Sequence, residues 1–297
     1  MKYRKLGGSD LSVSKVSFGC MSLGTDNDAN ASLLHRAADA GINYFDTADI
    51  YQNGFNEETV GRALKPIRTK VILATKVGNR IRPDGSLDWD ASKKYILQSV
   101  DKSLARLQTD YIDVYQLHGG TIQDPIDETI EAFELLKQQG KIRHYGISSI
   151  RPNVIREYIK RSRIVSVMMQ YSLLDRRPEE ECLDLLHQYN ISVLARGSIA
   201  KGLLAGKAPE PFLNHTAEEV SRAAAAIQSV SGTKKTPASA AIYYTLHHPA
   251  VASAVVGIRT PQQLEESIDA MSSPPLTSTE INLLQKSIPA NHYELHK

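Results

Sequence analysis

The chain has 297 residues, of which 41% are hydrophobic and 23% are charged, and its net charge is +2. These proportions are ordinary for a folded protein with a full apolar core, and the small charge gives no electrostatic reason to expect nucleic acid as the main partner. No apolar run is long enough to predict a membrane span, and the first residues lack the pattern of a secretion signal. Cys20 and Cys182 form no metal-binding pattern, and two cysteines are too few for disulfide bonds to stabilise a fold of this size. We expect a cytoplasmic protein that is a monomer by default.

Extended and helical patterns alternate along the chain. Residues 3–14 predict a small hairpin around the turn residues 7–10. Apolar runs then predict eight strands, at 16–19, 43–46, 71–76, 111–118, 143–148, 165–170, 192–196 and 251–257. Helical periodicity predicts helices between and after these strands. They span 30–40, 57–64, 90–107, 126–138, a helix opened by Pro152, 178–189, 217–230, 237–247, 260–271 and 277–287, followed by a tail at 288–297.

This alternation predicts the fold. Strands that alternate with helices form parallel sheets, and eight such units in one uninterrupted run predict a closed α/β barrel, the (β/α)8 TIM barrel. We expect residues 1–297 to form one domain of this kind. The alternative is an open doubly wound sheet, which usually carries a G-x-G-x-x-G turn after its first strand. Residues 18–24 read Phe-Gly-Cys-Met-Ser-Leu-Gly and do not match that turn.

Four side chains with acid–base chemistry stand at or just after the ends of three consecutive predicted strands. Asp46 ends the second strand and Tyr51 follows on its loop, while Lys76 ends the third strand and His118 the fourth. The carboxyl ends of the strands form the active-site face of such a barrel. Each residue alone could be a turn cap, a half-exposed aromatic or a structural polar group. The four together predict an acid–base site.

A tyrosine beside a lysine is suited to protonating an alkoxide that forms from a carbonyl group. A free phenol has a pKa of about 10, and a neighbouring ammonium favours the phenolate. Asp46 can hold Lys76 in place, and His118 can orient a substrate oxygen beside Tyr51, the general acid. These residues contain no hydride source, so a reduction at this site requires a cofactor.

The sequences Asp-Thr-Ala-Asp-Ile-Tyr, Ala-Thr-Lys and Gln-Leu-His-Gly-Gly, in this order and spacing, resemble the aldo-keto reductase superfamily. The nearest resemblance is to its bacterial branch, which is also similar to potassium-channel β-subunits. The resemblance covers residues 6 to about 273. It implies a barrel that binds NADP(H), Tyr51 as proton donor, and a catalytic tetrad of Asp46, Tyr51, Lys76 and His118.

The resemblance also implies cofactor contacts along the same face. Ser148 and Ser149 lie in Gly-Ile-Ser-Ser, where the family has Gly-Val-Ser-Asn, and Gln170 matches a glutamine that binds the nicotinamide carboxamide. Gly19 and Met21 match a backbone segment that lies against the cofactor in the family. The resemblance places Asp46 beside the cofactor as well. The segment after the seventh strand resembles a pyrophosphate loop. Its members are Gly197, Ser198, Lys201, Gly202 and Leu203.

Arg196 departs from the family pattern, because many relatives have at this position a tyrosine that stacks on the nicotinamide ring. A guanidinium also stacks on flat rings, but a positively charged, oxidised nicotinamide would repel it. Alternatively, Arg196 points toward the pyrophosphate or toward an anionic substrate.

The segment after the last strand resembles the family's site for the adenosine end of the cofactor. Arg259 can form bidentate bonds to a 2′-phosphate, and Thr260 can cap a helix at Pro261 whose N-terminus attracts anions. Arg259 therefore favours NADP over NAD. The other contacts implied here are those of Gly257, Gln263, Glu266 and Ser267.

Together these features predict an NADPH-dependent reductase of aldehydes and ketones, with a small-molecule carbonyl substrate and no metal. Two alternatives stay open: a nucleotide-binding regulatory or redox-sensing protein, and an aldolase in which Lys76 forms a Schiff base. The loop at 78–89, with Arg80, Arg82 and Trp89, could line the substrate pocket, although Trp89 is expected to pack the next helix. The tail could fold over the site or be disordered.

Overall fold

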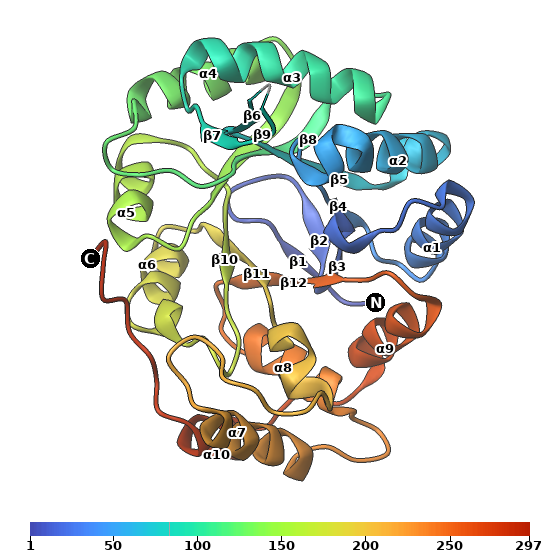
Figure 1. Ribbon diagram of the computed structural model, residues 1–297, viewed down its shortest axis with the longest axis vertical. Helices are drawn as coiled ribbons and strands as arrows, with labels where there is room; N and C mark the ends of the chain where they lie inside the picture. The colour runs from blue at the N-terminus through green and yellow to red at the C-terminus, as the bar shows by residue number, and fades with distance from the viewer. Residues whose placement is uncertain (83) are drawn as a thin grey trace.

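A closed barrel of eight parallel strands forms the centre of the molecule (Figure 1). The computed structural model describes residues 1–82 and 84–297. Around the barrel the strands follow the order β10-β11-β12-β3-β4-β5-β8-β9. The predicted (β/α)8 barrel is confirmed. Its strands are β3 (Val16–Gly19), β4 (Tyr44–Asp46), β5 (Ile72–Val77), β8 (Ile112–Leu117), β9 (Ile142–Ser148), β10 (Ser166–Gln170), β11 (Ser192–Arg196) and β12 (Val251–Gly257).

Helices surround the barrel, as Figure 1 shows. They are α1 (Asn27–Asp39), α2 (Phe55–Leu64), α3 (Lys93–Leu107), α4 (Ile126–Gln138), α5 (Pro152–Arg161), α6 (Cys182–Gln188), α7 (Ala217–Ser229), α8 (Pro237–Leu246), α9 (Pro261–Ser272) and α10 (Ser278–Ser287). Short 3₁₀ turns join some of these elements. They are η1 (Cys20–Ser22), η2 (Tyr51–Gly54), η3 (Lys65–Lys70), η4 (Arg177–Glu179) and η5 (Ala200–Ala205).

Three helices begin three or more residues away from the expected position. Helix α1 begins earlier because the Asp26 carboxylate caps it, and α3 begins later because the Ser92 hydroxyl caps it. A side chain that accepts backbone N–H groups at this point sets where the first turn starts. The helix expected from residue 178 begins instead as the turn η4, and α6 follows from Cys182.

The predicted N-terminal hairpin closes the amino end of the barrel. Strands β1 (Tyr3–Lys5) and β2 (Ser12–Ser14) pair antiparallel, and apolar side chains from the hairpin pack with the lower layer of barrel residues. A Cβ at Gly7, whose φ is +51°, would lie 2.3 Å from a barrel carbonyl oxygen, so only glycine fits this close approach. The cluster is Leu6, Leu11, Val13, Tyr44, Ile72, Ala74, Val114, Val165, Met168, Leu194, Ala252 and Val255.

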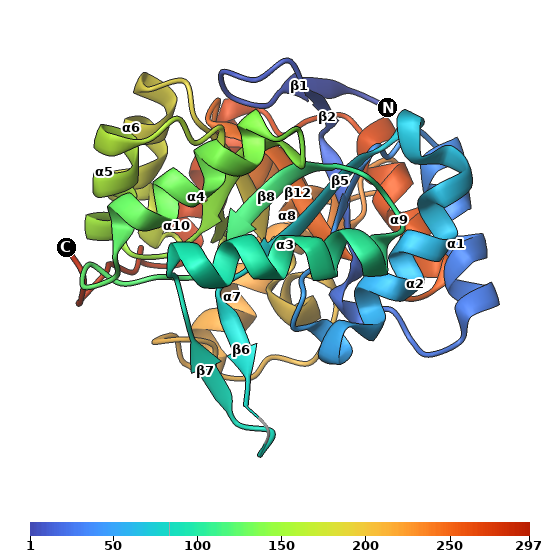
Figure 2. The ribbon, with the colours of Figure 1, turned by 90° about the horizontal axis from the view of Figure 1, so that it is seen from above.

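A second hairpin occupies the segment expected to be a loop at 78–89. Strands β6 (Asn79–Ile81) and β7 (Leu87–Trp89) pair antiparallel, and the hairpin projects from the end of the molecule opposite β1 and β2 (Figure 2). Arg80 and Arg82 both pair with Asp88 across it. Residue 83 of this segment lies outside the described residues.

The tail after α10 has no regular structure but packs against the barrel's outer layer. Asn291 accepts a hydrogen bond from the backbone of Arg176 at 2.7 Å, Tyr293 is buried, and the backbone oxygen of His296 accepts from Asn153 at 2.9 Å. Among the described helices, none is long and apolar enough to cross a membrane.

Candidate active site

Asp46, Tyr51, Lys76 and His118 meet at the carboxyl end of the barrel because adjacent parallel strands deliver them there. Asp46 is the last residue of β4 and Lys76 the last but one of β5. His118 directly follows β8, and its backbone N–H donates to the carbonyl oxygen of Val77 at 2.7 Å. Tyr51 begins the turn η2 on the loop after β4.

A buried ion pair lies at the centre of this group. Lys76 Nζ is 2.6 Å from Asp46 Oδ2, donates to the carbonyl oxygen of Thr47 at 2.6 Å, and donates to Tyr51 Oη at 3.4 Å. Gln116 Nε2 donates to the other carboxylate oxygen of Asp46 at 3.2 Å. Lys76 is 1% exposed and Asp46 is 4% exposed. These bonds fix the ammonium beneath the phenol oxygen.

The charge of Lys76 is maintained by its partner. Burial by itself would lower the pKa of Lys76, but the charges of Asp46 and Tyr51 and the hydrogen bonds to both together outweigh that effect, and the net result is a raised pKa. The ammonium also lies 5.0 Å from the centre of the Tyr51 ring. A fixed ammonium at this place stabilises negative charge on the phenol oxygen.

His118 stands edge-on to Tyr51, with ring centres 5.8 Å apart and an interplanar angle of 82°. Burial, with the charges of Lys76 and Arg196, lowers the pKa of His118 to about 3. The imidazole is therefore neutral near pH 7 and carries one N–H donor. Its Nδ1 is buried and has no hydrogen-bond partner among the described residues.

The residues predicted to lie beside the cofactor occupy the same rim. Gly19 is in register with Asp46 on one side and with Gly257 on the other. Met21 follows in η1 and is 64% exposed. A Cβ at Gly19 would lie 3.2 Å from the backbone oxygen of Val256, so glycine allows the two strands to approach closely.

Across the barrel, Ser148, Gln170 and Arg196 end the neighbouring strands β9, β10 and β11. Arg196 is exposed, and its guanidinium donates to Gln170 Oε1 at 3.0 Å. Ser149 is buried, and its hydroxyl accepts from the backbone N–H of Arg151 at 3.1 Å. Gln170 and Arg196 are thus hydrogen-bonded to each other. The Ser149 hydroxyl is used within the turn that leads to Arg151.

The predicted pyrophosphate loop runs from the end of β11 into η5. Lys201 is exposed, with a positive φ of 56°. Ser198 and Leu203 are buried instead, and the Ser198 hydroxyl accepts from Thr245 Oγ1 at 3.3 Å. Their side chains belong to the core, so these two residues can present only backbone atoms to a ligand. Positive φ values also occur at Gly197 and Gly202.

The N-terminus of α9 has the expected cap. Thr260 Oγ1 accepts from the backbone N–H of Gln263 at 3.2 Å, and Gln263 Oε1 accepts from that of Arg259 at 3.0 Å. The Arg259 side chain is exposed, whereas Ser267 is 3% exposed and donates to the backbone oxygen of Gln263. Glu266 accepts from Gln262 Nε2 at 3.0 Å. Of these side chains, Arg259 is the one best placed for an anion.

The sequence matches the Aldo/keto reductase family over residues 15–289. The chain belongs to this family. It is 52% identical to an uncharacterized oxidoreductase of Bacillus subtilis, YqkF, with 100% of each chain covered. The structure resembles the holo form of the aldo-keto reductase AKR11C1 from Bacillus halodurans, with a TM-score of 0.93, 50% identity and coverage of 100% of this chain and 99% of that one.

More distant members extend the comparison. The Schizosaccharomyces pombe aldo-keto reductase yakc, whose name includes NADP(+), is 33% identical over 70% of this chain and 65% of its own. A probable voltage-gated potassium channel subunit beta of rice is 28% identical over 95% of this chain and 94% of its own. The resemblance to the bacterial branch near the channel subunits is thus confirmed, and membership makes this chain an oxidoreductase of a family that uses a nicotinamide cofactor.

Several residues around the tetrad were not predicted. Gln116 is fully buried and holds Asp46. It stands two residues before His118, and the two-residue period of a strand was a signal that could have identified it. Ser22 Oγ is buried without a partner among the described residues, and a Cβ at Gly257 would lie 3.1 Å from it. The position of Ser22 depends on the turn η1, which no pattern in the sequence predicted.

Asp49 lies on the loop that carries Tyr51. Its Oδ1 is buried without a described partner, and burial, with the charge of Glu57, raises the pKa of Asp49 to about 7. Glu57 is itself fully buried and pairs with Arg106 at 2.6 Å. Two carboxyl groups therefore lie at the loop of Tyr51. Glu57 has a cationic partner, and Asp49 forms no salt bridge within the described residues.

Trp89 packs at the base of the second hairpin, against the loop after His118. Its indole N–H donates to both carboxylate oxygens of Asp124, at 3.0 and 3.1 Å. A Cβ at Gly78, whose φ is +120°, would lie 2.7 Å from the ring, and one at Gly119 would lie 3.4 Å from it. Trp89 thus contacts the loop of His118 and is not confined to the start of α3.

Proposed function

We propose that this protein is an NADPH-dependent reductase that converts aldehydes or ketones into alcohols, with Tyr51 as the proton donor. The observation that carries the proposal is the position of the Lys76 ammonium, 2.6 Å from Asp46 and 3.4 Å from Tyr51 Oη. A neutral His118 stands beside the same phenol. This set can position a carbonyl oxygen and give it a proton.

The residues of the chain act on the oxygen of the substrate. A bound nicotinamide cofactor would supply the hydride that adds to the carbonyl carbon. His118 donates its N–H to the carbonyl oxygen and so orients it beside Tyr51. As negative charge grows on that oxygen, Tyr51 transfers the phenol proton to it, and Lys76 stabilises the phenolate that remains. Asp46 keeps the ammonium charged and in place.

The rim offers suitable groups to each part of NADPH. Gln170 and Ser148 provide an amide and a hydroxyl for the nicotinamide carboxamide, and Lys201 provides an exposed cation for the pyrophosphate. Arg259 and the capped N-terminus of α9 suit the 2′-phosphate, because Arg259 forms no ion pair within the described part of the chain. Ser22 Oγ, which is buried and has no hydrogen-bond partner among the described residues, lies beside Gly257 on the same side of the rim.

The test compares wild type with Tyr51→Phe, using NADPH and a reactive aromatic aldehyde. The variant should bind NADPH with unchanged affinity, measured by fluorescence, but lose at least about 100-fold in kcat/KM because the general acid is gone. Tyr189→Phe, which removes an exposed hydroxyl elsewhere, is the matched control. Equal turnover by Tyr51→Phe and wild type would remove Tyr51 from the mechanism, and absence of NADPH binding would refute the cofactor assignment.

A regulatory or redox-sensing role is the second candidate, favoured by the likeness to a channel subunit and by Arg196 at the nicotinamide end. Binding of NADPH without turnover across a broad set of carbonyl compounds would support it. The aldolase alternative is disfavoured, because a Schiff base requires an uncharged lysine and Asp46 holds Lys76 as the ammonium.

A further inference from the structure

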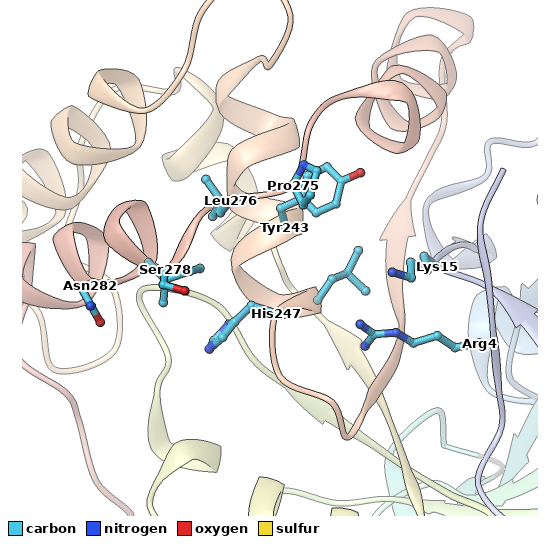
Figure 3. A pocket seen from close by; sticks show the side chains of 10 residues that line it. Arg4, Lys15, Tyr243, His247, Pro275, Leu276, Ser278 and Asn282 are labelled. Carbon is cyan, nitrogen blue, oxygen red and sulfur yellow. The ribbon is translucent and has the colours of Figure 1, made fainter.

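A cavity of about 400 Å³ lies near the amino end of the barrel, away from the tetrad (Figure 3). Lys15, on its wall, directly precedes β3, whereas the tetrad stands at the carboxyl ends of the strands. Its walls come from segments distant in sequence: the side of the first hairpin, the end of α8, and the segment that enters α10. The mechanism proposed above makes no use of this cavity.

Two cationic side chains, Arg4 and Lys15, form one wall. In Figure 3 both extend from the hairpin side toward α8. Arg4 Nη1 donates to the backbone oxygens of His248, at 3.2 Å, and of Val251. Neither cation forms an ion pair with a carboxylate in the parts of the chain that the structure describes, 1–82 and 84–297. Backbone carbonyl oxygens solvate Arg4 in part, but no carboxylate of the described residues neutralises either charge.

The environment makes this arrangement unfavourable for the protein alone. Burial lowers the pKa of Arg4, and burial lowers that of Lys15, with further lowering by the charges of Arg4 and Lys2. Like charges in a partly buried site repel each other more strongly than in water. A bound anion would relieve the repulsion and replace the water lost from both groups.

The facing wall combines apolar side chains with the polar groups of His247, Ser278 and Asn282. Leu246 and Ile281 are almost fully buried beneath it, and Leu276 is half-buried beside them. Inorganic ions would leave this surface in contact with water, whereas a short hydrocarbon chain would cover it. Two cations on one side, with no carboxylate partner among the described residues, and aliphatic side chains among those of the other side fit a ligand with an anionic head and a short apolar body.

We propose that this cavity binds a small amphipathic organic anion. A carboxylate or phosphate group lies between Arg4 and Lys15, and a short aliphatic chain lies against Leu246, Leu276 and Ile281. The two head groups share the chemistry that the cations recognise, namely a charged group with several hydrogen-bond acceptors. The site is independent of the proposed reduction and of the cofactor.

Calorimetric titrations of the full chain, with NADPH in excess to cover the predicted cofactor sites, test the proposal. The probes are octanoate, octyl phosphate, octanol and inorganic phosphate. At least one of the two amphipathic anions should saturate one site, and the tighter of them identifies the head group. Octanol and inorganic phosphate should each bind at least about tenfold more weakly, since octanol lacks the anionic group and inorganic phosphate lacks the hydrocarbon chain. Added salt should weaken the binding of the anion.

Variants locate the site. Lys15→Gln should weaken binding of the anion at least about tenfold, and Leu276→Glu should abolish it by placing a carboxylate in the cavity. Lys2→Gln, an exposed lysine two residues from Arg4 and outside the cavity wall, is the matched control and should change affinity less than about twofold. Lys15→Gln should unfold at the same temperature as wild type or higher, because it removes repulsion, whereas a purely structural lysine would lower that temperature.

Three results would overturn the proposal. Wild type might show no saturable binding of either amphipathic anion. Lys15→Gln and wild type might bind the anion equally, which would place it elsewhere on the molecule. Octanol or inorganic phosphate might bind as tightly as the amphipathic anions, which would show that one of the two walls contributes nothing.

Discussion

Lys76 is enclosed by protein, and its ammonium depends on Asp46 for charge compensation. A buried ion pair adds little net stability, but loss of one partner leaves an uncompensated charge that costs roughly 3–5 kcal/mol. The pair is therefore suited to fixing a charge in one place more than to holding the fold together. At the residue scale the site is a fixed ammonium, a phenol above it and a neutral imidazole beside it.

Asp49 gives a pH dependence that can be measured. The pKa of Asp49 is about 7 in the folded protein and about 3.9 in an unfolded chain. Between about pH 4 and about pH 7 the folded state therefore keeps a proton on Asp49 that the unfolded state has released. Stability from this group is full below about pH 4 and is lost as the pH rises to about 7. Asp49→Asn should thus gain roughly 1–3 kcal/mol over wild type at pH 8, and less at pH 5. Urea unfolding at both pH values checks this, and an equal difference at both would contradict it.

Arg259 is the residue that we propose distinguishes NADPH from NADH. Arg259→Gln should raise the Kd for NADPH by about tenfold or more, because a charge-assisted pair with the 2′-phosphate is lost. The Kd for NADH, which lacks that phosphate, should stay unchanged. Lys286→Gln removes an exposed cation on α10 and serves as control. If the two cofactors weaken equally, Arg259 does not read the 2′-phosphate.

At the scale of elements, the β6–β7 hairpin depends on side chains at its base. Hydrogen bonds from Arg80 and Arg82 hold the pKa of Asp88 well below its usual range, but the two arginines are exposed, so these pairs add little to stability. The contacts of Trp89 with Asp124 and with Gly78 fix the hairpin to the barrel. We therefore place its anchoring in the tryptophan.

Trp89→Phe tests that anchoring. Phenylalanine keeps a ring against Gly78 but removes the N–H donor to Asp124, so the free energy of unfolding should fall by about 1–2 kcal/mol. Leu87→Ala, in the same hairpin and 67% exposed, should stay within about 0.5 kcal/mol of wild type. Denaturant titration measures both. Equal stability of Trp89→Phe and wild type would show that the hydrogen bond contributes nothing.

Strand and helix order could be predicted from the sequence because buried parallel strands are apolar runs and the helices have a regular apolar face. The tetrad positions followed from the strand ends. The β6–β7 hairpin could not be predicted, since ion pairs across it replace apolar alternation. Helix starts shifted where Asp26 and Ser92 act as caps. The buried Ser198 and Ser149 show that a motif gives a residue's position but not the direction of its side chain.

At the scale of the whole molecule, the two ends of the barrel differ in kind. The first hairpin closes the barrel interior at the amino end with apolar side chains, and the tetrad lies at the carboxyl end. The tail returns to this end and, with Arg151, Arg177 and Asn214, lines a hollow of about 400 Å³. The tail therefore lies beside the loops that follow β9 and β10.

Deletion of residues 290–297 should lower the free energy of unfolding by about 2–3 kcal/mol, because the buried Tyr293 ring and the bonds of Asn291 are lost. The Kd for NADPH should stay unchanged, since none of the predicted cofactor contacts lies in this tail. Leu295→Ala, at a side chain that is 71% exposed, is the control and should be neutral. An unchanged unfolding curve for the deletion would mean that the tail does not stabilise the barrel.

The barrel closes where its first strand, β3, pairs with its last strand, β12. The pairing runs from Val16 beside Ala254 to Gly19 beside Gly257. During synthesis, β3 leaves the ribosome more than 200 residues before its partner. Until β12 emerges, β3 and β11 each have an unpaired edge, and such edges attract other strands. The nascent chain is thus most exposed to aggregation, and most in need of a chaperone, just before its last strand is made.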